Sequence, residues 1–183
     1  MSCRTLALVL LPLLAACASP PDDPQSEWDA GAGRQPEPAT LFSMARIYVA
    51  QGRDDQAEAA LREVLDQDPD FVRAYEELAH LYVRRDLVDG AVAALEVGLK
   101  HHADDPVLLN DLGVCKLLQK DPASAEQAFI RAAAIEPSNA RPRANLALAL
   151  ALQGRDDEAL ALWQQVIRPS EAAKNLELVK QAR

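Results

Sequence analysis

A pattern of small and apolar residues recurs along this chain every 34 positions, and this period constrains the fold more than any other feature. The pattern is clearest between Pro106 and Asn139. One alanine falls at the same place in each of four copies, without an insertion: Ala57, Ala91, Ala125 and Ala159. Internal periods of this size are typical of stacked helical hairpins, in which each copy forms a helix, a turn and a second helix. The period therefore predicts a helical repeat protein.

The composition agrees with helices and limits the range of partners. Hydrophobic residues make up 49% of the chain but aromatic residues only 4%, which suits close-packed helices better than a sheet. The formal net charge is −9, whereas binding to a phosphate backbone needs clustered lysine and arginine. We therefore expect no nucleic-acid partner, and no motif indicates a cofactor.

The order of residues within one copy resembles the tetratricopeptide repeat. In the third copy, Leu112-Gly113 is followed by Ala125, Phe129 and Pro137, and that family favours a Leu-Gly pair, an alanine, an aromatic residue and a proline at these places. The resemblance implies an all-α fold, a right-handed superhelical solenoid of four helix-turn-helix units with a C-terminal capping helix. The implied units are residues 38–71, 72–105, 106–139 and 140–169, followed by a capping helix and tail at 170–183.

Residues 1–16 have the features of a secretory signal peptide. Arg4 precedes an apolar stretch over residues 6–16, which is too short to cross a hydrocarbon core about 30 Å thick. The Leu-Ala-Ala sequence at 14–16, followed by Cys17, resembles the lipobox of bacterial lipoproteins, a family in which this cysteine is lipidated. The resemblance implies a lipid anchor at Cys17. Ordinary cleavage among the same small residues, which would release a soluble protein, is the alternative.

Residues 17–37 are predicted to be a disordered tether that begins with the lipidated cysteine. They are rich in proline, acidic and small residues, and they cannot bury enough apolar surface to offset the entropy of ordering. Trp28 is the one aromatic residue of this segment, and we expect it to be exposed or to fold back on the first unit. Ala18 after the cysteine, rather than aspartate, resembles the sorting signal of outer-membrane lipoproteins. We therefore expect a bacterial cell-envelope protein, anchored in the outer membrane and facing the periplasm.

The turns between the two helices of a unit differ between the copies. Gly52 and Gly154 end the first helices of units one and four, and glycine accepts the left-handed conformation of a helix C-terminus at little cost. Asp86 and Lys120 stand at the same place in units two and three. We expect the helix ends in these two units to be weaker or differently built.

Two helix starts are predicted from their capping residues. Asp121 followed by Pro122 provides an N-cap and a first-position proline for the second helix of unit three. The segment from Ser170 to Gln181 is predicted to form the capping helix, with Ser170 as its N-cap.

No catalytic constellation or metal site is expected. His101 and His102 fall at the end of a helix, where cationic side chains interact favourably with the helix dipole, and no cluster of Cys or His supplies further ligands at suitable spacing. Cys115 is expected to be a small buried hydrophobe. His80 is expected to be a contact in a binding groove. The sequence thus favours a protein that is not an enzyme.

The binding surface is expected on the concave face of the stack. In the tetratricopeptide-repeat family the first helix of each unit lines this face, and transferring the family's inward-facing positions identifies nine residues. They are Phe42, Arg46, Arg73, Glu76, His80, Arg84, Asn110, Arg141 and Asn145. Arginine can pair with a carboxylate through two hydrogen bonds, and asparagine can meet both donors and acceptors of a peptide backbone. The implied partner is a segment of another protein, although simple solvation would explain several of these residues equally well.

A narrower resemblance concerns the last repeat and the capping helix. The segments 145–150, 154–155, 158–159, 170–173 and 175–176 resemble the small repeat lipoproteins of tight-adherence (Flp) pilus assembly. This resemblance implies an envelope-anchored adaptor that assists the assembly of a pilus or secretion machine through its groove. The alternatives are a lipoprotein that regulates an enzyme of cell-wall or outer-membrane biogenesis and, less favoured, a hydrolase.

Overall fold

Helices account for all the regular structure in the described part of the chain. The computed structural model describes residues 35–183, which form nine α-helices and no strand, so the predicted all-α class is confirmed. The predictions for the signal peptide, Cys17 and Trp28 fall outside these residues. None of the helices within 35–183 combines the length and the apolarity that a membrane span requires.

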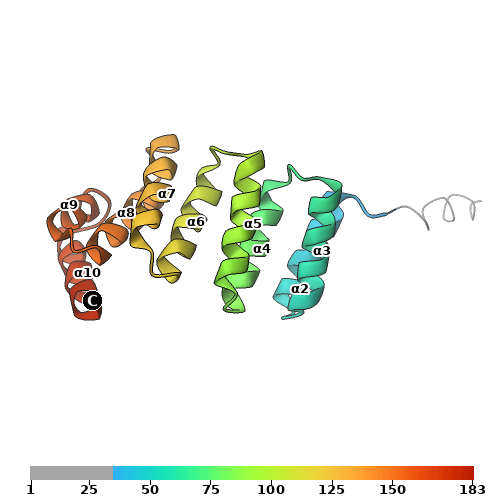
Figure 1. The fold of residues 1–183 in the computed structure, drawn as a ribbon, viewed down its shortest axis with the longest axis horizontal. Coiled ribbons are helices and arrows are strands. Elements are labelled where there is room, and N and C mark those ends of the chain that lie inside the picture. Colours follow the sequence, from blue (N-terminus) through green and yellow to red (C-terminus); the bar gives the residue numbers. More distant parts are fainter. Residues whose placement is uncertain (1–34) are drawn as a thin grey trace, which may run out of the picture. The chain divides into compact units, whose positions relative to one another are not determined.

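Eight of these helices form four hairpins that follow the 34-residue period. The first helices of the hairpins are α2 (Pro38–Ala50), α4 (Val72–Arg84), α6 (Pro106–Leu118) and α8 (Ala140–Leu152). The second helices are α3 (Asp54–Gln67), α5 (Val88–His101), α7 (Pro122–Ile135) and α9 (Asp156–Val166). A further helix, α10 (Pro169–Ala182), follows the last hairpin. Figure 1 shows the hairpins side by side in chain order, from α2 and α3 to α8 and α9.

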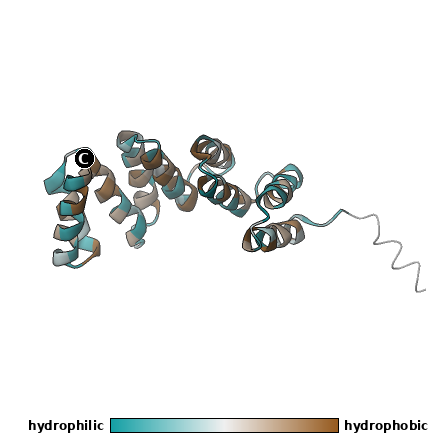
Figure 2. Cartoon of the chain, turned by 90° about the horizontal axis from the view of Figure 1, so that it is seen from below, coloured by the Kyte–Doolittle hydropathy of each residue, from teal (hydrophilic) through white to brown (hydrophobic). Residues whose placement is uncertain are grey.

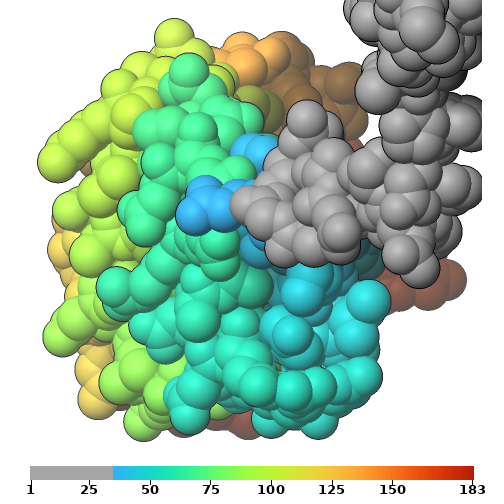
Figure 3. Space-filling view, turned by 90° about the vertical axis from the view of Figure 1, so that its right-hand side faces the viewer, coloured from blue at the N-terminus to red at the C-terminus, as the bar shows by residue number. Residues whose placement is uncertain are grey.

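Each hairpin packs on itself and on its neighbours in the sequence. The two helices of every hairpin contact each other, the second helix contacts the first helix of the next hairpin, and α10 contacts α8 and α9. Every helix carries both hydrophobic and hydrophilic residues (Figure 2), and the buried apolar side chains extend from Leu41 in α2 to Leu176 in α10. Figure 3 views this stack from its α2–α3 end. The arrangement is the solenoid that the period predicts.

Small residues lie where the helices approach most closely. Ala125 in α7 has no exposed surface, and its equivalents in the other hairpins are equally buried: Ala57, Ala91 and Ala159. In α6 a Cβ atom added to Gly113 would lie 2.5 Å from Cε1 of Phe129. Unit three thus combines the smallest residue with a large ring. At the equivalent places, unit one combines Ala45 with Leu61, both fully buried.

The four hairpin turns adopt one geometry, although their residues differ. The backbone is left-handed in each, with φ of 69° at Gly52, 82° at Gly154, 60° at Asp86 and 62° at Lys120. In each turn the next N–H donates to the carbonyl five residues earlier, at 2.9–3.0 Å, as in the common glycine-ended helix terminus. The helix ends in units two and three are therefore not differently built. The packing of the hairpin imposes the turn, and the two non-glycine residues bear the cost of left-handed backbone.

The helix starts agree with the capping prediction in one case and differ in the other. Asp121 accepts a hydrogen bond from the N–H of Ser124 at 3.0 Å, and a proline follows it, as expected. The capping helix, however, begins at Pro169 with Arg168 as N-cap, so the prediction of Ser170 as N-cap is wrong. The fixed φ of proline suits the first helical position, which moves the N-cap two residues earlier, from Ser170 to Arg168.

The pairing of Gly113 with Phe129 can be tested by a double-mutant cycle. We expect Gly113→Ala to destabilise the protein by about 1–2 kcal/mol. Overpacking costs about 1–3 kcal/mol, and the higher helix propensity of alanine offsets up to about 1 kcal/mol of this. Adding Phe129→Leu reproduces the alanine–leucine pair of unit one. Urea denaturation should then find the double variant more stable than the sum of the single effects predicts. Strict additivity would show that the two residues do not share one packing space.

Candidate functional site

The first helices of three consecutive hairpins lie next to one another and form one surface. Helix α4 contacts α6, and α6 contacts α8. A cavity of about 280 Å³ opens between them. Its lining residues come from all three helices: Ala79, His80, Val83, Arg84, Asp111, Val114, Cys115 and Arg141. We call the surface of α4, α6 and α8 around this cavity the groove.

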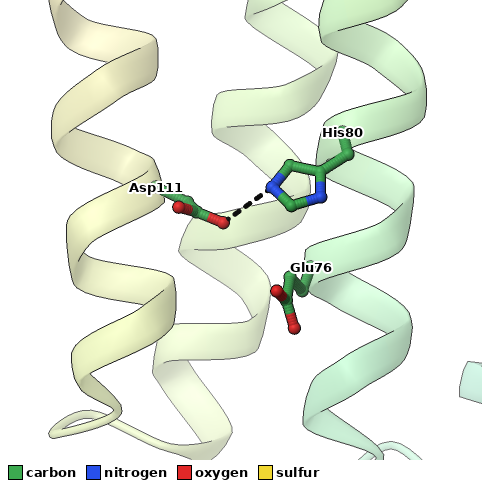
Figure 4. Close-up of side chains that lie close together, drawn as sticks. All are labelled: Glu76, His80 and Asp111. Carbon is green, nitrogen blue, oxygen red and sulfur yellow. Dashed lines mark hydrogen bonds and ion pairs between the residues drawn. The ribbon is translucent and has the colours of Figure 1, made fainter. Parts of the chain in front are cut away.

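A chain of hydrogen bonds joins the three helices across the groove. The Nε2–H of His80 in α4 donates to Oδ2 of Asp111 in α6 at 2.9 Å, as Figure 4 shows. The other oxygen of the same carboxylate accepts from Nδ2 of Asn110 at 3.1 Å, and Nδ2 of Asn145 in α8 donates to Oδ1 of Asn110 at 2.9 Å. We call these four residues the polar floor. Asn110 and Asp111 are buried, and the bonds they make offset the cost of removing them from water.

The polar floor changes the proton affinity of its neighbours. The hydrogen bond that His80 donates to Asp111 raises the pKa of His80 above its ordinary value, because the carboxylate favours the cationic ring. Burial, followed by the nearby charge of Asp111, raises the pKa of Glu76. Burial also raises the pKa of the Cys115 thiol to about 11, so this sulfur stays protonated at neutral pH and is a poor nucleophile. Cys115 is a buried side chain, as the sequence predicts.

The sequence did not identify Asp111, although six of the nine predicted groove residues lie around it. Those six are Glu76, His80, Arg84, Asn110, Arg141 and Asn145. A signal was present, because Asp111 is the one carboxylate in the mostly apolar sequence of α6, PVLLNDLGVCKLL. Charged residues are rarely buried unless they are paired, so an acid in the middle of such a helix indicates a partner on a neighbouring element.

The other three predicted residues lie towards the α2 side. Phe42 is only 4% exposed, and its ring packs against Phe71 with the centroids 5.1 Å apart. Phe42 is therefore a core side chain and offers little open surface. The guanidinium of Arg73 covers this ring at 4.8 Å from its centroid. Arg46 lies 3.8 Å from the carboxylate of Glu77, which links α2 to α4.

Four exposed arginines lie on the first helices. The side chains of Arg46, Arg84 and Arg141 are 60%, 46% and 64% exposed, and Arg73 is also exposed. Each of the first three lies within 4 Å of a carboxylate oxygen, with Arg141 at 3.7 Å from Oδ1 of Asp111. Pairs this exposed are weak and exchange easily with other anions. A chain of net charge −9 thus presents cations on the groove side of its first helices.

The two remaining histidines have structural partners elsewhere. His101 Nδ1 lies 3.2 Å from Oδ1 of Asp70, and His102 Nε2 lies 3.0 Å from the backbone oxygen of Asp70. These bonds tie the end of α5 to the turn before α4. They agree with the interpretation of both histidines as helix-end residues.

Comparison with known families accounts for the repeat. A model of the tetratricopeptide repeat matches residues 48–110, and a second model of the same repeat matches residues 143–172. The chain is a tetratricopeptide-repeat protein. Members of this family are generally scaffolds without enzymatic activity. A search of curated proteins found no match.

Solved tetratricopeptide-repeat structures share the fold at low sequence identity. The crystal structure of MamA is 20% identical, with a TM-score of 0.68 over 79% of this chain and 81% of that chain. YrrB, described as a repeat protein with an unusual peptide-binding site, is 20% identical with a TM-score of 0.65 over 78% and 75%. The first repeat domain of Spaghetti (RPAP3), bound to the HSP90 peptide SRMEEVD, is 18% identical with a TM-score of 0.58 over 62% and 90%.

The contribution of the polar floor to stability can be measured at Asp111. We expect Asp111→Ala to lower the free energy of unfolding by about 1–3 kcal/mol, because it leaves buried polar groups without partners. Asp111→Asn should cost less, since it keeps an oxygen acceptor. Asp104→Ala is a matched control, because this aspartate is 84% exposed and its ion pair with Arg131 is long, at 3.7 Å. The control should stay within about 0.5 kcal/mol. Equal urea midpoints for Asp111→Ala and the control would contradict a stabilising floor.

Proposed function

We propose that this protein is a non-enzymatic adaptor whose groove binds a segment of another protein. The observation that carries the proposal is the combination of exposed arginines with a pre-formed polar floor on adjacent first helices. A rigid floor lowers the entropy cost of binding, because its side chains are ordered before the partner arrives. The peptide-binding site described for YrrB and the peptide bound to Spaghetti (RPAP3) support the same use of the fold.

The chemistry of the groove favours a segment that alternates acidic and apolar residues. Guanidinium groups pair with carboxylates through two parallel hydrogen bonds, which gives both affinity and orientation. Val83 and Val114 line the cavity beside Arg84 and Arg141, so an apolar side chain can enter between two cations. A basic segment would instead lose the interactions that the arginines offer.

The proposal extends to the place where the adaptor works. We infer that Cys17 is lipidated and holds the repeats at the bacterial outer membrane, facing the periplasm, where the groove assists the assembly of a pilus or secretion machine. The lipobox-like sequence before Cys17 and the resemblance of the last repeat to tight-adherence pilus lipoproteins support this extension.

Neutralising two exposed arginines of the first helices, Arg141 beside the cavity and Arg73 on α4, should abolish partner capture. The test compares native protein with Arg73→Gln/Arg141→Gln in co-purification from solubilised envelopes, followed by identification of the partners. Arg131→Gln/Arg168→Gln is the matched control, because it removes the same charge from α7 and from the residue before α10. We expect a component of a pilus or secretion machine to co-purify with the native protein and with the control, but not with Arg73→Gln/Arg141→Gln. An acidic peptide should release it, whereas the same peptide with lysine in place of glutamate should not.

Two outcomes would count against the proposal. Capture that survives in Arg73→Gln/Arg141→Gln would refute the groove as the binding site. Groove-dependent recovery of an enzyme of cell-wall synthesis would keep the adaptor and remove the pilus assignment.

The lipid anchor has a separate test. We expect Cys17→Ser to move the protein from the membrane fraction to the soluble fraction and to abolish incorporation of a labelled fatty acid, because serine offers no thiol for acylation. Cys115→Ser is the control and should leave both readouts unchanged, since that thiol is buried. Membrane association that persists in Cys17→Ser without acyl label would contradict the anchor.

A further inference from the structure

Three side chains from two adjacent units converge at the groove with the chemistry of metal ligands. Glu76 and His80 lie four residues apart in α4 and therefore on the same face of the helix. Asp111 reaches them from α6. Each residue offers one ligand atom, and these atoms all lie within 4.8 Å of one another. Figure 4 shows the three side chains turned towards the space between the two helices.

The ligand atoms lie near enough for small side-chain movements to bring them to the spacing around a bound zinc ion. Zinc–nitrogen distances are about 2.0–2.1 Å and zinc–oxygen distances about 2.0–2.2 Å, so ligand atoms around a tetrahedral ion lie roughly 3.4 Å apart. The Nε2 of His80 and the Oδ2 of Asp111 are 2.9 Å apart and share a proton, so the ion would displace this proton to solvent and the two atoms would separate slightly. Glu76 needs only a rotation within its own side chain, which has several accessible rotamers.

The surroundings hold Asp111 in the orientation that a ligand needs. Its Oδ1 accepts from Asn110 at 3.1 Å and lies 3.7 Å from Arg141, which leaves Oδ2 for the interior of the cluster. Asn145 fixes Asn110 in turn, at 2.9 Å. Outer hydrogen bonds of this kind orient the ligands of natural metal sites.

We propose that Glu76, His80 and Asp111 bind a divalent transition-metal ion, with zinc as the best fit. The imidazole ligand favours zinc over calcium and magnesium, which prefer oxygen ligands alone. Three protein ligands leave a fourth position, and the half-exposed side chain of His80 places that position on the groove side. The positive charge of the ion also offsets the repulsion between the carboxylates of Glu76 and Asp111. This site is independent of any partner protein, so its test needs the metal alone.

Calorimetric titration of the full chain with zinc tests the proposal. We expect the native protein to bind one zinc ion. In His80→Ala and in Asp111→Asn this binding should disappear or its affinity should fall by more than about tenfold, since even changes to groups around the ligands lower metal affinity about 10–100-fold. His101→Ala/His102→Ala is the matched control and should bind as the native protein does, because those histidines bond Asp70. Thermal melts of the variants without metal establish that each one is folded, and His80→Ala provides a second variant if Asp111→Asn unfolds.

Cobalt absorption distinguishes this site from the cysteines. Oxygen and nitrogen ligands give only weak visible bands, whereas a thiolate adds an intense charge-transfer band in the near ultraviolet. Weak bands that vanish in His80→Ala support the proposal. Unchanged zinc affinity in His80→Ala, binding lost only in the His101→Ala/His102→Ala control, or a thiolate band as the sole signal would each overturn it.

Discussion

Close approach between helices is the constraint on which the rest of this structure depends. Two helices can pack at short distance only where side chains are small, and this chain meets the condition with buried alanines and with Gly113. The same closeness brings α4, α6 and α8 into contact. Without it, side chains from three different units could not share hydrogen bonds, and the groove would have no continuous floor.

Asp111 occupies the most demanding position in the molecule. A carboxylate removed from water costs several kcal/mol unless other groups compensate it, and here His80, Asn110 and Arg141 surround it. Each compensating group comes from the groove side of a first helix. The charge that is hardest to bury therefore also organises the surface that is proposed to bind a partner.

The period predicted the helices and their order because packing repeats with the sequence, but it could not predict features that depend on contacts between units. Asp111 has partners in the preceding and following units, about 30 residues away in either direction, and a repeat pattern does not encode such pairs. The alternative that the turns at Asp86 and Lys120 are differently built was wrong, because tertiary packing imposes the left-handed residue that local preference disfavours. Phe42 was assigned to the groove by its position in the repeat, whereas the neighbouring Phe71 covers it.

The polar floor has a consequence for how the stack opens. In a solenoid each unit is stabilised mainly by its nearest neighbours, so the ends fray before the centre. The hydrogen bonds that connect His80 to Asn145 through Asp111 and Asn110 fasten units two, three and four together. Local unfolding should therefore begin at the two ends of the solenoid that lie outside this fastening, α2 and α3 at one end and α10 at the other, rather than between units two, three and four.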